Sequence, residues 1–252
     1  MEWIIPNWPA PAHIQACTTT RIGGISEGVF AGFNVGDHVG DNPTHVAQNR
    51  AQLAQRFAGP IHWLTQTHST RVVNLDLGPA NQADADASFS SQINQICAVM
   101  TADCLPVLFC DRLGTQVAAA HAGWRGLCDG VLEQTLSHFS QPIADILVWL
   151  GPAIGPKAFE VGAEVREQFI AQQAQAVSAF TAAQAINPHA DSHKYFADIY
   201  QLARLRLQAL GIDAESIYGG DYCTYTDAAR FFSYRREGQT GRMVSCITIG
   251  TL

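Results

Sequence analysis

The stretch AVMTADCLPVLFCDRLGTQVAAAHAGWRG, residues 98–126, decides the fold of this 252-residue chain. Its apolar runs are typical of buried strands, which we expect around Ile96–Met100, Val107–Asp111 and Gln116–Ala120. Cys104 follows the first run and His121 follows the last, with a helix expected over Leu127–Phe139. A thiol and an imidazole therefore lie at strand ends, where a rigid scaffold holds side chains and leaves them reachable.

A second imidazole, that of His68, lies upstream in the segment TQTHS, residues 65–69. Two imidazoles and one thiolate are a set that zinc accepts, and three protein ligands leave the fourth tetrahedral position for water or substrate. The same residues fit two other interpretations: Cys104 as a nucleophile with His121 as its base, or a buried cysteine and two surface histidines without chemistry. Asp103 could support another loop, cap a turn, or accept the N–H of a ligand imidazole.

Helices and strands mix without strict alternation along the rest of the chain. Asn42 and Pro43 are an N-cap and a first helical residue, which predicts a helix to about Phe57. Further helices are expected over about Val161–Gln172 and Phe196–Leu210. Further strands are expected at His13–Thr20, Ile61–Thr65, Arg71–Leu75, Ile146–Leu150, near Ile217, at Phe231–Tyr234 and at Met243–Ile249. This mixture predicts a mixed-sheet α/β or α+β sandwich.

Three polar or biased segments are expected to lie outside this framework. Gly78–Ser91, with Asp84 and Asp86, predicts a surface loop, and Ala171–Ile186 predicts a peripheral helix or loop. Arg235–Arg242 predicts a hairpin turn into the last strand. No internal repeat or linker divides the sequence, so we expect a single domain over residues 1–252.

Composition narrows the classes of partner. The formal net charge is -7 at pH 7, so we expect no basic face of the kind that binds nucleic acid. No apolar run approaches the roughly 20 residues of a membrane span, and the N-terminus does not resemble a signal peptide. The seven cysteines are odd in number and form no C-x-x-C pair, which indicates reduced thiols and a cytoplasmic protein.

Arginines near the C-terminus are candidates for an anion clamp. Arg235 and Arg236 end the segment FFSYRR, and Arg125 and Arg21 could join them. A planar guanidinium can give a phosphate two parallel hydrogen bonds, although two adjacent arginines also fit a solvated hairpin. The glycine-rich segment around Gly23–Gly28 could cradle a phosphate or form a plain turn, and it lacks the ending of a Walker loop.

Short motifs along the chain resemble the YfiH-type laccase-domain family, whose members are also described as polyphenol oxidases and purine nucleoside phosphorylases. The motifs are TTRIGGISEG (19–28), NVGDHVGD (34–41), QTHS (66–69), TADCLP (101–106), HAGWRG (121–126), GPAIG (151–155), EVG (160–162), FSYRR (232–236) and TGR (240–242). They run essentially from end to end, so the resemblance is specific.

The resemblance implies a single-domain α/β/β/α-type sandwich. It also implies a zinc site whose ligands, which are also the expected catalytic residues, are His68, Cys104 and His121. The implied activity is phosphorolysis of adenosine, inosine and methylthioadenosine, with adenosine deamination alongside. The expected substrate- or phosphate-binding residues are Arg21, Asn34, Arg125, Arg235 and Arg236.

Three alternatives compete with this function. A multicopper laccase needs several H-x-H pairs, and none of the nine histidines forms one, although a His₂Cys trio also suits a single copper ion. A cysteine or zinc hydrolase (an amidase) that edits peptidoglycan precursors is a second enzyme class, and a non-enzymatic zinc or redox module is a third. Zinc lowers the pKa of a bound water to about 7, which deamination needs. We therefore expect an enzyme of purine nucleosides and phosphate with zinc as cofactor and copper as the alternative.

Overall fold

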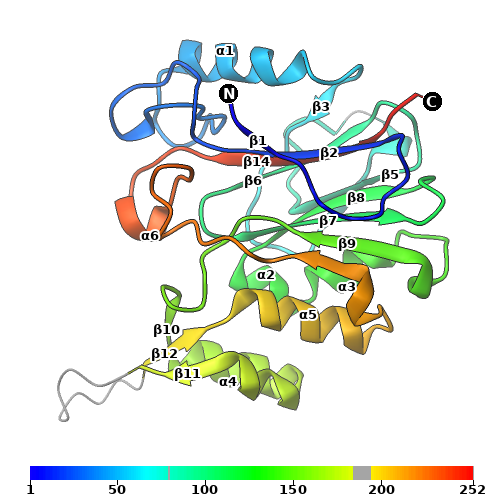
Figure 1. Cartoon of the computed structure of the whole chain (residues 1–252), viewed down its shortest axis with the longest axis vertical. Helices are drawn as coiled ribbons and strands as arrows, with labels where there is room; N and C mark the ends of the chain where they lie inside the picture. The colour runs from blue at the N-terminus through cyan, green and yellow to red at the C-terminus, as the bar shows by residue number, and fades with distance from the viewer. Residues whose placement is uncertain (79, 184–193, 252) are drawn as a thin grey trace.

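The computed structural model describes residues 1–78, 80–183 and 194–251, which form four stacked layers (Figure 1). Helix α1 (Pro43–Ala54) covers one face of a five-stranded sheet, and a six-stranded sheet packs on the other face. Helices α2 (Trp124–Asp129), α3 (Val131–Leu136) and α5 (Ile199–Ala209) cover the far face of the six-stranded sheet. This layer order is the predicted α/β/β/α sandwich.

The five-stranded sheet has the order β1-β2-β14-β6-β3. Its strands are β1 (Trp3–Ile4), β2 (Ile14–Thr19), β3 (Ile61–His62), β6 (Ile96–Thr101) and β14 (Met243–Ile249). β6 and β14 are buried along their whole length because other layers cover both faces of the sheet, which explains their nearly continuous apolar sequences. β3 runs parallel to β6 and the other pairs are antiparallel.

The six-stranded sheet has the order β13-β9-β7-β8-β5-β4. Its strands are β4 (Val72–Asn74), β5 (Ala87–Ser90), β7 (Leu105–Asp111), β8 (Val117–Ala122), β9 (Ile146–Leu150) and β13 (Ile217–Gly219). The antiparallel β7–β8 pair lies at its centre with Pro106 opposite His121. β4 with β5 and β9 with β13 are parallel, so this sheet is also mixed, as expected.

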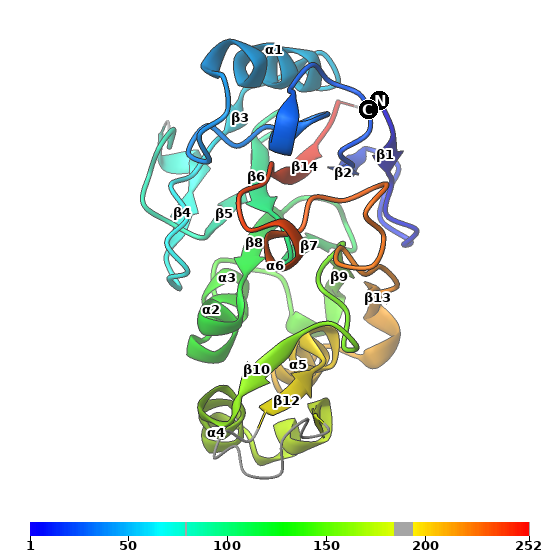
Figure 2. The same ribbon diagram turned by 90° about the vertical axis from the view of Figure 1, so that its left-hand side faces the viewer.

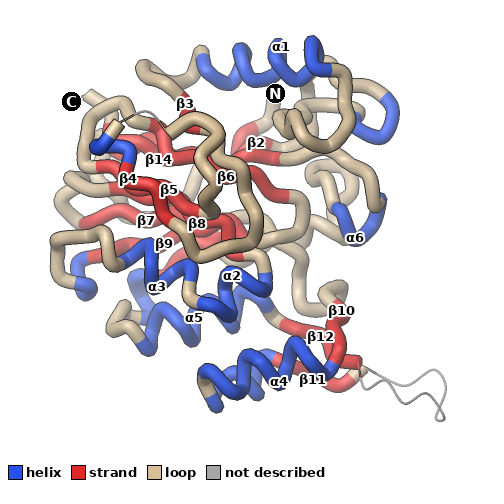
Figure 3. The backbone as a smooth tube through the Cα atoms, turned by 180° about the vertical axis from the view of Figure 1, so that it is seen from behind, coloured by secondary structure: helices blue, strands red, loops and turns tan. Residues whose placement is uncertain are grey.

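A smaller unit lies beyond the α2, α3 and α5 layer (Figures 2 and 3). Helix α4 (Ala163–Gln172) packs there on a three-stranded sheet, whose strands are β10 (Glu160–Gly162), β12 (Lys194–Ala197) and β11 (Phe180–Ala182). The last short helix is α6 (Tyr234–Glu237), and 3₁₀ turns occupy Gly28–Phe30, Leu75–Leu77, Ile143–Asp145, Ala174–Ala179 and Ala214–Ser216.

Three apolar clusters hold the layers together. Leu108, Trp149 and Phe232 are among the side chains that fill the space between the two large sheets. A larger cluster under α2, α3 and α5 and a smaller one under α1 fill the outer interfaces. The seven cysteines are all free, and no helix in the described ranges is long and apolar enough to cross a membrane.

A local sequence signal placed the start of α1 correctly. The side chain of Asn42 accepts a hydrogen bond from the amide of Thr44, with Pro43 at the first helical position, as predicted for this cap. α1 ends three residues before Phe57. The single helix expected over Leu127–Phe139 is wrong, because Gly130 adopts a left-handed φ of 102° and divides it into α2 and α3.

Two further expectations are wrong for reasons of burial. The stretch Phe231–Tyr234 forms no strand, since Phe231 and Phe232 enter the core and Tyr234 begins α6 instead of a hairpin. The predicted surface loop Gly78–Ser91 contains β5, all of which is buried. Ala171–Ile186 is mainly helical, as expected, with the end of α4 and a 3₁₀ turn, but it also includes the short strand β11. Its last residues lie outside the described part of the chain.

Candidate metal centre and substrate pocket

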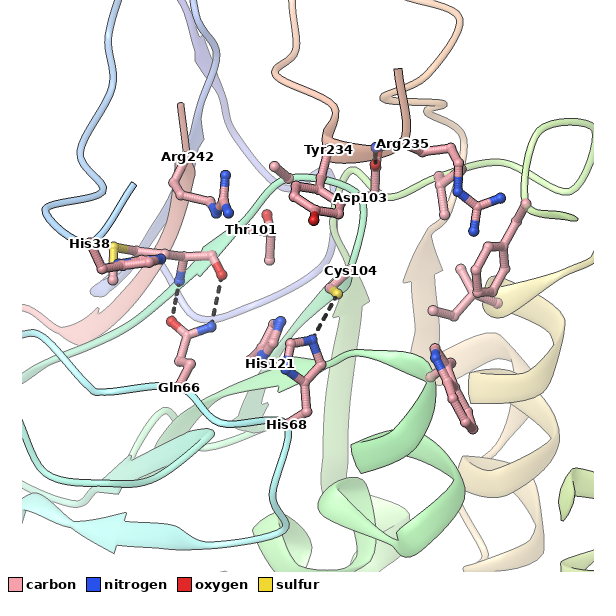
Figure 4. A pocket seen from close by; sticks show the side chains of 16 residues that line it. His38, Gln66, His68, Thr101, Asp103, Cys104, His121, Tyr234, Arg235 and Arg242 are labelled. Atoms are coloured by element: carbon pink, nitrogen blue, oxygen red, sulfur yellow. Dashed lines mark hydrogen bonds between the residues drawn. The ribbon is translucent and has the colours of Figure 1, made fainter. Parts of the chain in front are cut away.

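Three reactive side chains from separate segments meet at one end of the two large sheets (Figure 4). One donor atom each of His68, Cys104 and His121 lies within 4.8 Å of the other two. Nε2 of His68 is 3.6 Å from Sγ of Cys104. The structure therefore brings together the three residues that the sequence predicted as ligands.

Two connections that cross from one sheet to the other create this meeting point. Residues 102–104 join β6 of the five-stranded sheet directly to β7 of the six-stranded sheet, and the loop that carries His68 joins β3 to β4 across the same gap. His121 lies near the end of β8, beside the start of β7. Both crossings contain a strained residue, since φ is 62° at His68 and 99° at Asp103.

Asp103 supports a neighbouring loop, which was one of the three roles that its sequence position allowed. Its carboxylate accepts hydrogen bonds from the Thr224 hydroxyl at 2.6 Å and from the amide of Arg235 at 2.7 Å. It therefore holds the start of α6, and with it Tyr234 and Arg235, beside the three-residue centre.

Asp86 fixes both histidines of the centre. Its side chain is completely buried and accepts hydrogen bonds from the amides of Thr67, His68 and Ser69 at 3.1, 3.0 and 2.6 Å. The same carboxylate lies 2.8 Å from Nδ1 of His121. Because a carboxylate can only accept, Nδ1 carries the proton and Nε2 is left free as a metal ligand. Burial opposes the charge of Asp86, but the hydrogen bonds from His121 and Ser69 lower its pKa to about 2.

The neighbouring imidazoles favour the thiolate form of Cys104. Burial alone raises the pKa of this thiol, but the charge of His121 and hydrogen bonds from both imidazoles outweigh burial, and the pKa falls to about 6. For His121, burial lowers the pKa, while the Cys104 thiolate and Asp86 raise it to about 9. Both shifts favour a thiolate and imidazolium pair in the metal-free protein, and a metal that takes Nε2 of His121 as a ligand would displace the proton from that atom.

The donor set fits a metal ion with three protein ligands. Zinc–sulfur and zinc–nitrogen bonds of about 2.3 and 2.0 Å place two tetrahedral ligands about 3.5 Å apart, close to the 3.6 Å between His68 and Cys104. His68 is exposed and Cys104 half-buried, so the group can be reached from outside. An S,N,N donor set suits zinc and copper alike, and the geometry gives no preference between them.

The absence of a side chain at Gly123 allows His68 and Cys104 to lie this close together, and this leads to our first prediction. A Cβ on this residue would lie 2.4 Å from Cδ2 of His68 and 3.1 Å from Sγ of Cys104. We expect Gly123→Ala to lower metal affinity by at least about 10-fold, as displacement of a supporting group does, with far-ultraviolet circular dichroism unchanged. Gly28→Ala is the control for metal affinity, which it should leave unchanged because its Cβ meets nothing within 4 Å, while its φ of 60° should cost some stability. Equal metal affinity in Gly123→Ala and wild type would show that the site tolerates the methyl group.

A cavity of about 420 Å³ includes the centre in its wall, a size typical of small-molecule sites. Its apolar side is formed by Trp124, Ile154, Phe159 and Ile199. Its polar side, labelled in Figure 4, includes His38, Gln66, Tyr234, Arg235 and Arg242. The cavity therefore offers a flat apolar surface, charged groups and a candidate metal centre together.

The structure separates the two adjacent arginines of the expected clamp. Arg235 lines the cavity, with its guanidinium 5.6 Å from the centre of the Phe159 ring. Arg236 turns the other way and donates hydrogen bonds to the main-chain oxygens of Thr224, Tyr225 and Phe231. Arg236 therefore fastens the loop that precedes α6.

The other three expected substrate-binding residues are also outside the cavity wall. Arg21 pairs with Glu237 at 2.9 Å, and Arg125 lies over the ring of Trp124. Asn34 is buried and bonds to neighbouring main-chain groups. The glycine-rich segment forms a turn closed by paired hydrogen bonds between Ser26 and Gly32.

Sequence reasoning did not single out several side chains that build the site. Gln66 makes two hydrogen bonds to the main chain of Met100 and so ties the His68 loop to β6. His38 and Arg242 line the cavity, and Asp86 holds the histidines. Gln66, His38 and Arg242 belong to motifs that carried the family resemblance, which was the available signal. Asp86 had no such signal, because its partners lie far away in sequence.

The chain is similar to known proteins over nearly its whole length. Residues 15–250 match the family model described as multi-copper polyphenol oxidoreductase laccase. The purine nucleoside phosphorylase YfiH of Escherichia coli is 55% identical over 246 residues, which cover 97% of each chain. A purine nucleoside phosphorylase of Pseudomonas aeruginosa is 52% identical over 245 residues, again covering 97% of each chain.

Solved structures share the fold. The crystal structure of the Neisseria meningitidis protein NMB0706 superposes with a TM-score of 0.92 at 46% identity and covers 100% of both chains. That of YlmD from Geobacillus stearothermophilus gives a TM-score of 0.83 at 30% identity, covering 100% of this chain and 97% of the other.

Proposed function

This chain belongs to the multi-copper polyphenol oxidoreductase laccase family, and we propose that it is a metal-dependent purine nucleoside phosphorylase acting on adenosine, inosine and methylthioadenosine. The observation that carries the proposal is the joint placement of a three-donor centre, an apolar wall and guanidinium groups around one cavity. Adenosine deamination is proposed as a second activity of the same site.

The apolar wall is the proposed place for the purine. Trp124 and Phe159 offer aromatic surfaces, and the guanidinium of Arg235 lies over the Phe159 ring. A planar, nitrogen-rich base can stack on such rings and accept hydrogen bonds from a guanidinium. Of the five residues expected from sequence to bind substrate or phosphate, Arg235 is the one that we retain for contact with substrate.

Phosphorolysis breaks the bond between C1′ of the sugar and the purine nitrogen and forms a bond from C1′ to a phosphate oxygen. The products are a sugar 1-phosphate and the free base, which takes up a proton. The protein's contribution is to orient the two reactants and stabilise the positive charge that develops on the sugar. His68, Cys104 and His121 would hold the metal, and a bound metal supplies Lewis-acid chemistry, including activation of water for deamination.

The polyphenol oxidase alternative has weaker support. A multicopper mechanism needs further histidine-rich metal sites, and within the described residues the His68, Cys104 and His121 group is the one cluster of three ligand side chains found. A single copper ion in this centre stays an alternative because the donor set suits it.

The amidase alternative rests on the placement of Cys104 beside two imidazoles, with Nε2 of His68 3.6 Å from its Sγ, which lowers the pKa of the thiol. A thiolate paired with an imidazolium is the usual state of a nucleophilic cysteine. In our proposal the same thiolate is a metal ligand. The two roles differ in the reactivity of the sulfur. A bound metal protects a ligand thiolate from alkylation, whereas a nucleophilic thiolate stays reactive.

Alkylation of Cys104 distinguishes these roles and is our second prediction. Zinc-loaded protein should resist iodoacetamide at Cys104, while chelator-treated protein should react there and lose nucleoside cleavage, since a coordinated thiolate has its electrons shared with the metal. Half-buried Cys223 is the internal reference and should react to the same extent in both samples. Intact mass with peptide mapping gives the measurement. An acyl adduct on Cys104 from a peptidoglycan precursor, with full activity in metal-free protein, would favour the amidase.

The functional test is a product assay on protein of known metal content. Adenosine, inosine and methylthioadenosine are supplied with and without inorganic phosphate, and bases, sugar 1-phosphates and deaminated nucleosides are quantified by chromatography. Phosphate-dependent release of free base is the expected result. If none of the three nucleosides releases its base, the proposal is refuted.

A further inference from the structure

Two sequence motifs with no role in the metal centre meet in the cavity wall. Asn34, which begins NVGDHVGD, accepts hydrogen bonds through its side-chain oxygen from the amide of Gly36 at 2.9 Å and from the amide of Arg242 at 2.8 Å. Arg242 ends the motif TGR. Buried Asn34 therefore joins the segment that carries His38 to the segment that carries Arg242.

The guanidinium of Arg242 is placed for an external partner. Its Nη1 donates to the main-chain oxygens of Thr240 and Gly241 at 2.9 and 3.0 Å. Within the described residues its Nε and Nη2 make no hydrogen bond, and no carboxylate lies within ion-pair distance. Arg50, which donates to the main-chain oxygen of Val35, differs, because Asp37 neutralises it at 3.1 Å.

Close packing holds the Arg242 side chain in this position. A Cβ on Gly36 would lie 2.8 Å from Cγ of Arg242, so the absence of a side chain at Gly36 makes room for the arginine stem. Burial lowers the pKa of Arg242, although the anionic character of Cys104 and Asp103 opposes this. A half-buried cation without a paired carboxylate attracts an anion strongly, since water screens it poorly.

A second cavity, of about 370 Å³, meets the first at this residue. His38, Tyr234 and Arg242 line both cavities, and the remaining wall of the second comes from Val39 and residues 238–240. Arg242 therefore lies at the boundary between the second cavity and the cavity that contains the metal centre.

We propose that His38 and Arg242 form the binding site for inorganic phosphate, and that the second cavity is its entrance. This proposal rests on the proposed phosphorylase function. It differs from the sequence expectation, which placed phosphate on Arg235 and Arg236. In the view of Figure 4, Arg242 and His38 lie on one side of the three-residue centre and Arg235 on the other.

This two-sided arrangement suits the reaction. A displacement at C1′ brings the attacking oxygen in opposite the leaving nitrogen, so phosphate and purine must approach the sugar from opposite sides. The apolar wall with Arg235 would hold the purine, and Arg242 with His38 would hold the phosphate. The sugar would then lie between them, beside the metal centre.

Charge-removing variants of the full, metal-loaded chain test the site. Arg242→Gln should raise the KM for inorganic phosphate about 10- to 100-fold, the loss typical of a hydrogen-bond partner to a charged group, with metal content and nucleoside KM unchanged. Arg242→Lys should recover part of the loss. Arg235→Gln should instead raise the KM for nucleoside. Arg112→Gln, at the far end of β7, should alter neither constant, and thermal melting should show that each variant is folded.

Direct titration separates failure of this site from failure of the phosphorylase function. Isothermal titration with inorganic phosphate, without nucleoside, should show binding to wild type that Arg242→Gln weakens. If wild type binds phosphate through Arg242 but cleaves no nucleoside, the site stands and the proposed function falls. If cleavage requires phosphate but Arg242→Gln changes neither its KM nor its Kd, the site is wrong and the function stands. Adenosine 5′-monophosphate is titrated in parallel. If it binds through Arg242 while inorganic phosphate does not bind, the assignment of the site to free phosphate is overturned.

Discussion

Cys104→Ala/His121→Ala should carry almost no metal, whereas the wild-type protein should contain about one zinc ion per chain, as three-ligand catalytic sites do. Removal of two donors leaves His68 alone, and one exposed imidazole cannot hold the ion. Nucleoside cleavage should fall by about 1,000-fold or more, because several kcal/mol of Lewis-acid stabilisation is lost. Elemental analysis of protein expressed without added metal, beside a phosphorolysis assay, makes the measurement.

The matched control replaces the same residue types away from the centre. Cys223→Ala/His138→Ala should keep its metal and its activity, since neither residue belongs to the three-donor group. Copper that is acquired during purification does not identify the native metal, because copper binds such donors more tightly than zinc does. Zinc occupancy that is equal in wild type and in Cys104→Ala/His121→Ala would contradict the assignment of the ligands.

The strands around the centre were predictable because they are buried on both faces. β6, β7 and β8 lie inside two stacked sheets, so their sequences are continuous apolar runs. β5 was missed because its sequence, ASFS, is short and half polar. It is buried only because β4, β8 and the neighbouring layers surround it. The division at Gly130 was missed because a glycine within a helical pattern is usually tolerated.

The site was partly predictable for a related reason. His68, Cys104 and His121 are residue types that zinc and copper accept as ligands, although a buried cysteine and two surface histidines also fitted the sequence, and the structure brings the three together. That they bind a metal stays a prediction. Adjacent Arg235 and Arg236 suggested a clamp, but the helical turn of α6 sends their side chains to different partners. The position of Arg242 depends on the hydrogen bond from its amide to Asn34, which lies 208 positions away in the sequence. Such a contact cannot be inferred from the spacing of residues.

Asp86→Ala is expected to damage the centre without removing any of its ligands. The carboxylate joins the Thr67–Ser69 segment to His121 through hydrogen bonds of 2.6–3.1 Å. Its loss leaves three amides and a buried imidazole N–H without their acceptor, which should cost about 3 kcal/mol or more of unfolding free energy. Metal affinity should fall about 10- to 100-fold, as for other partners of ligand histidines. Urea unfolding of metal-free protein and competition with a chromophoric chelator measure the two effects.

Asp84→Ala is the control, because Asp84 lies in the same segment and, among the described residues, its side chain bonds to the exposed Thr67 hydroxyl and to Arg71 but not to the histidines. It should lose little stability and no metal affinity. The pKa of Asp86 in the folded protein is about 2, below the unfolded value of about 3.9. Its contribution is therefore complete above about pH 5 and lost progressively as the pH falls toward 2, so the stability gap between wild type and Asp86→Ala should narrow over that interval. If the gap is equal at pH 2.5 and pH 6, the ionised carboxylate is not what joins the two histidines.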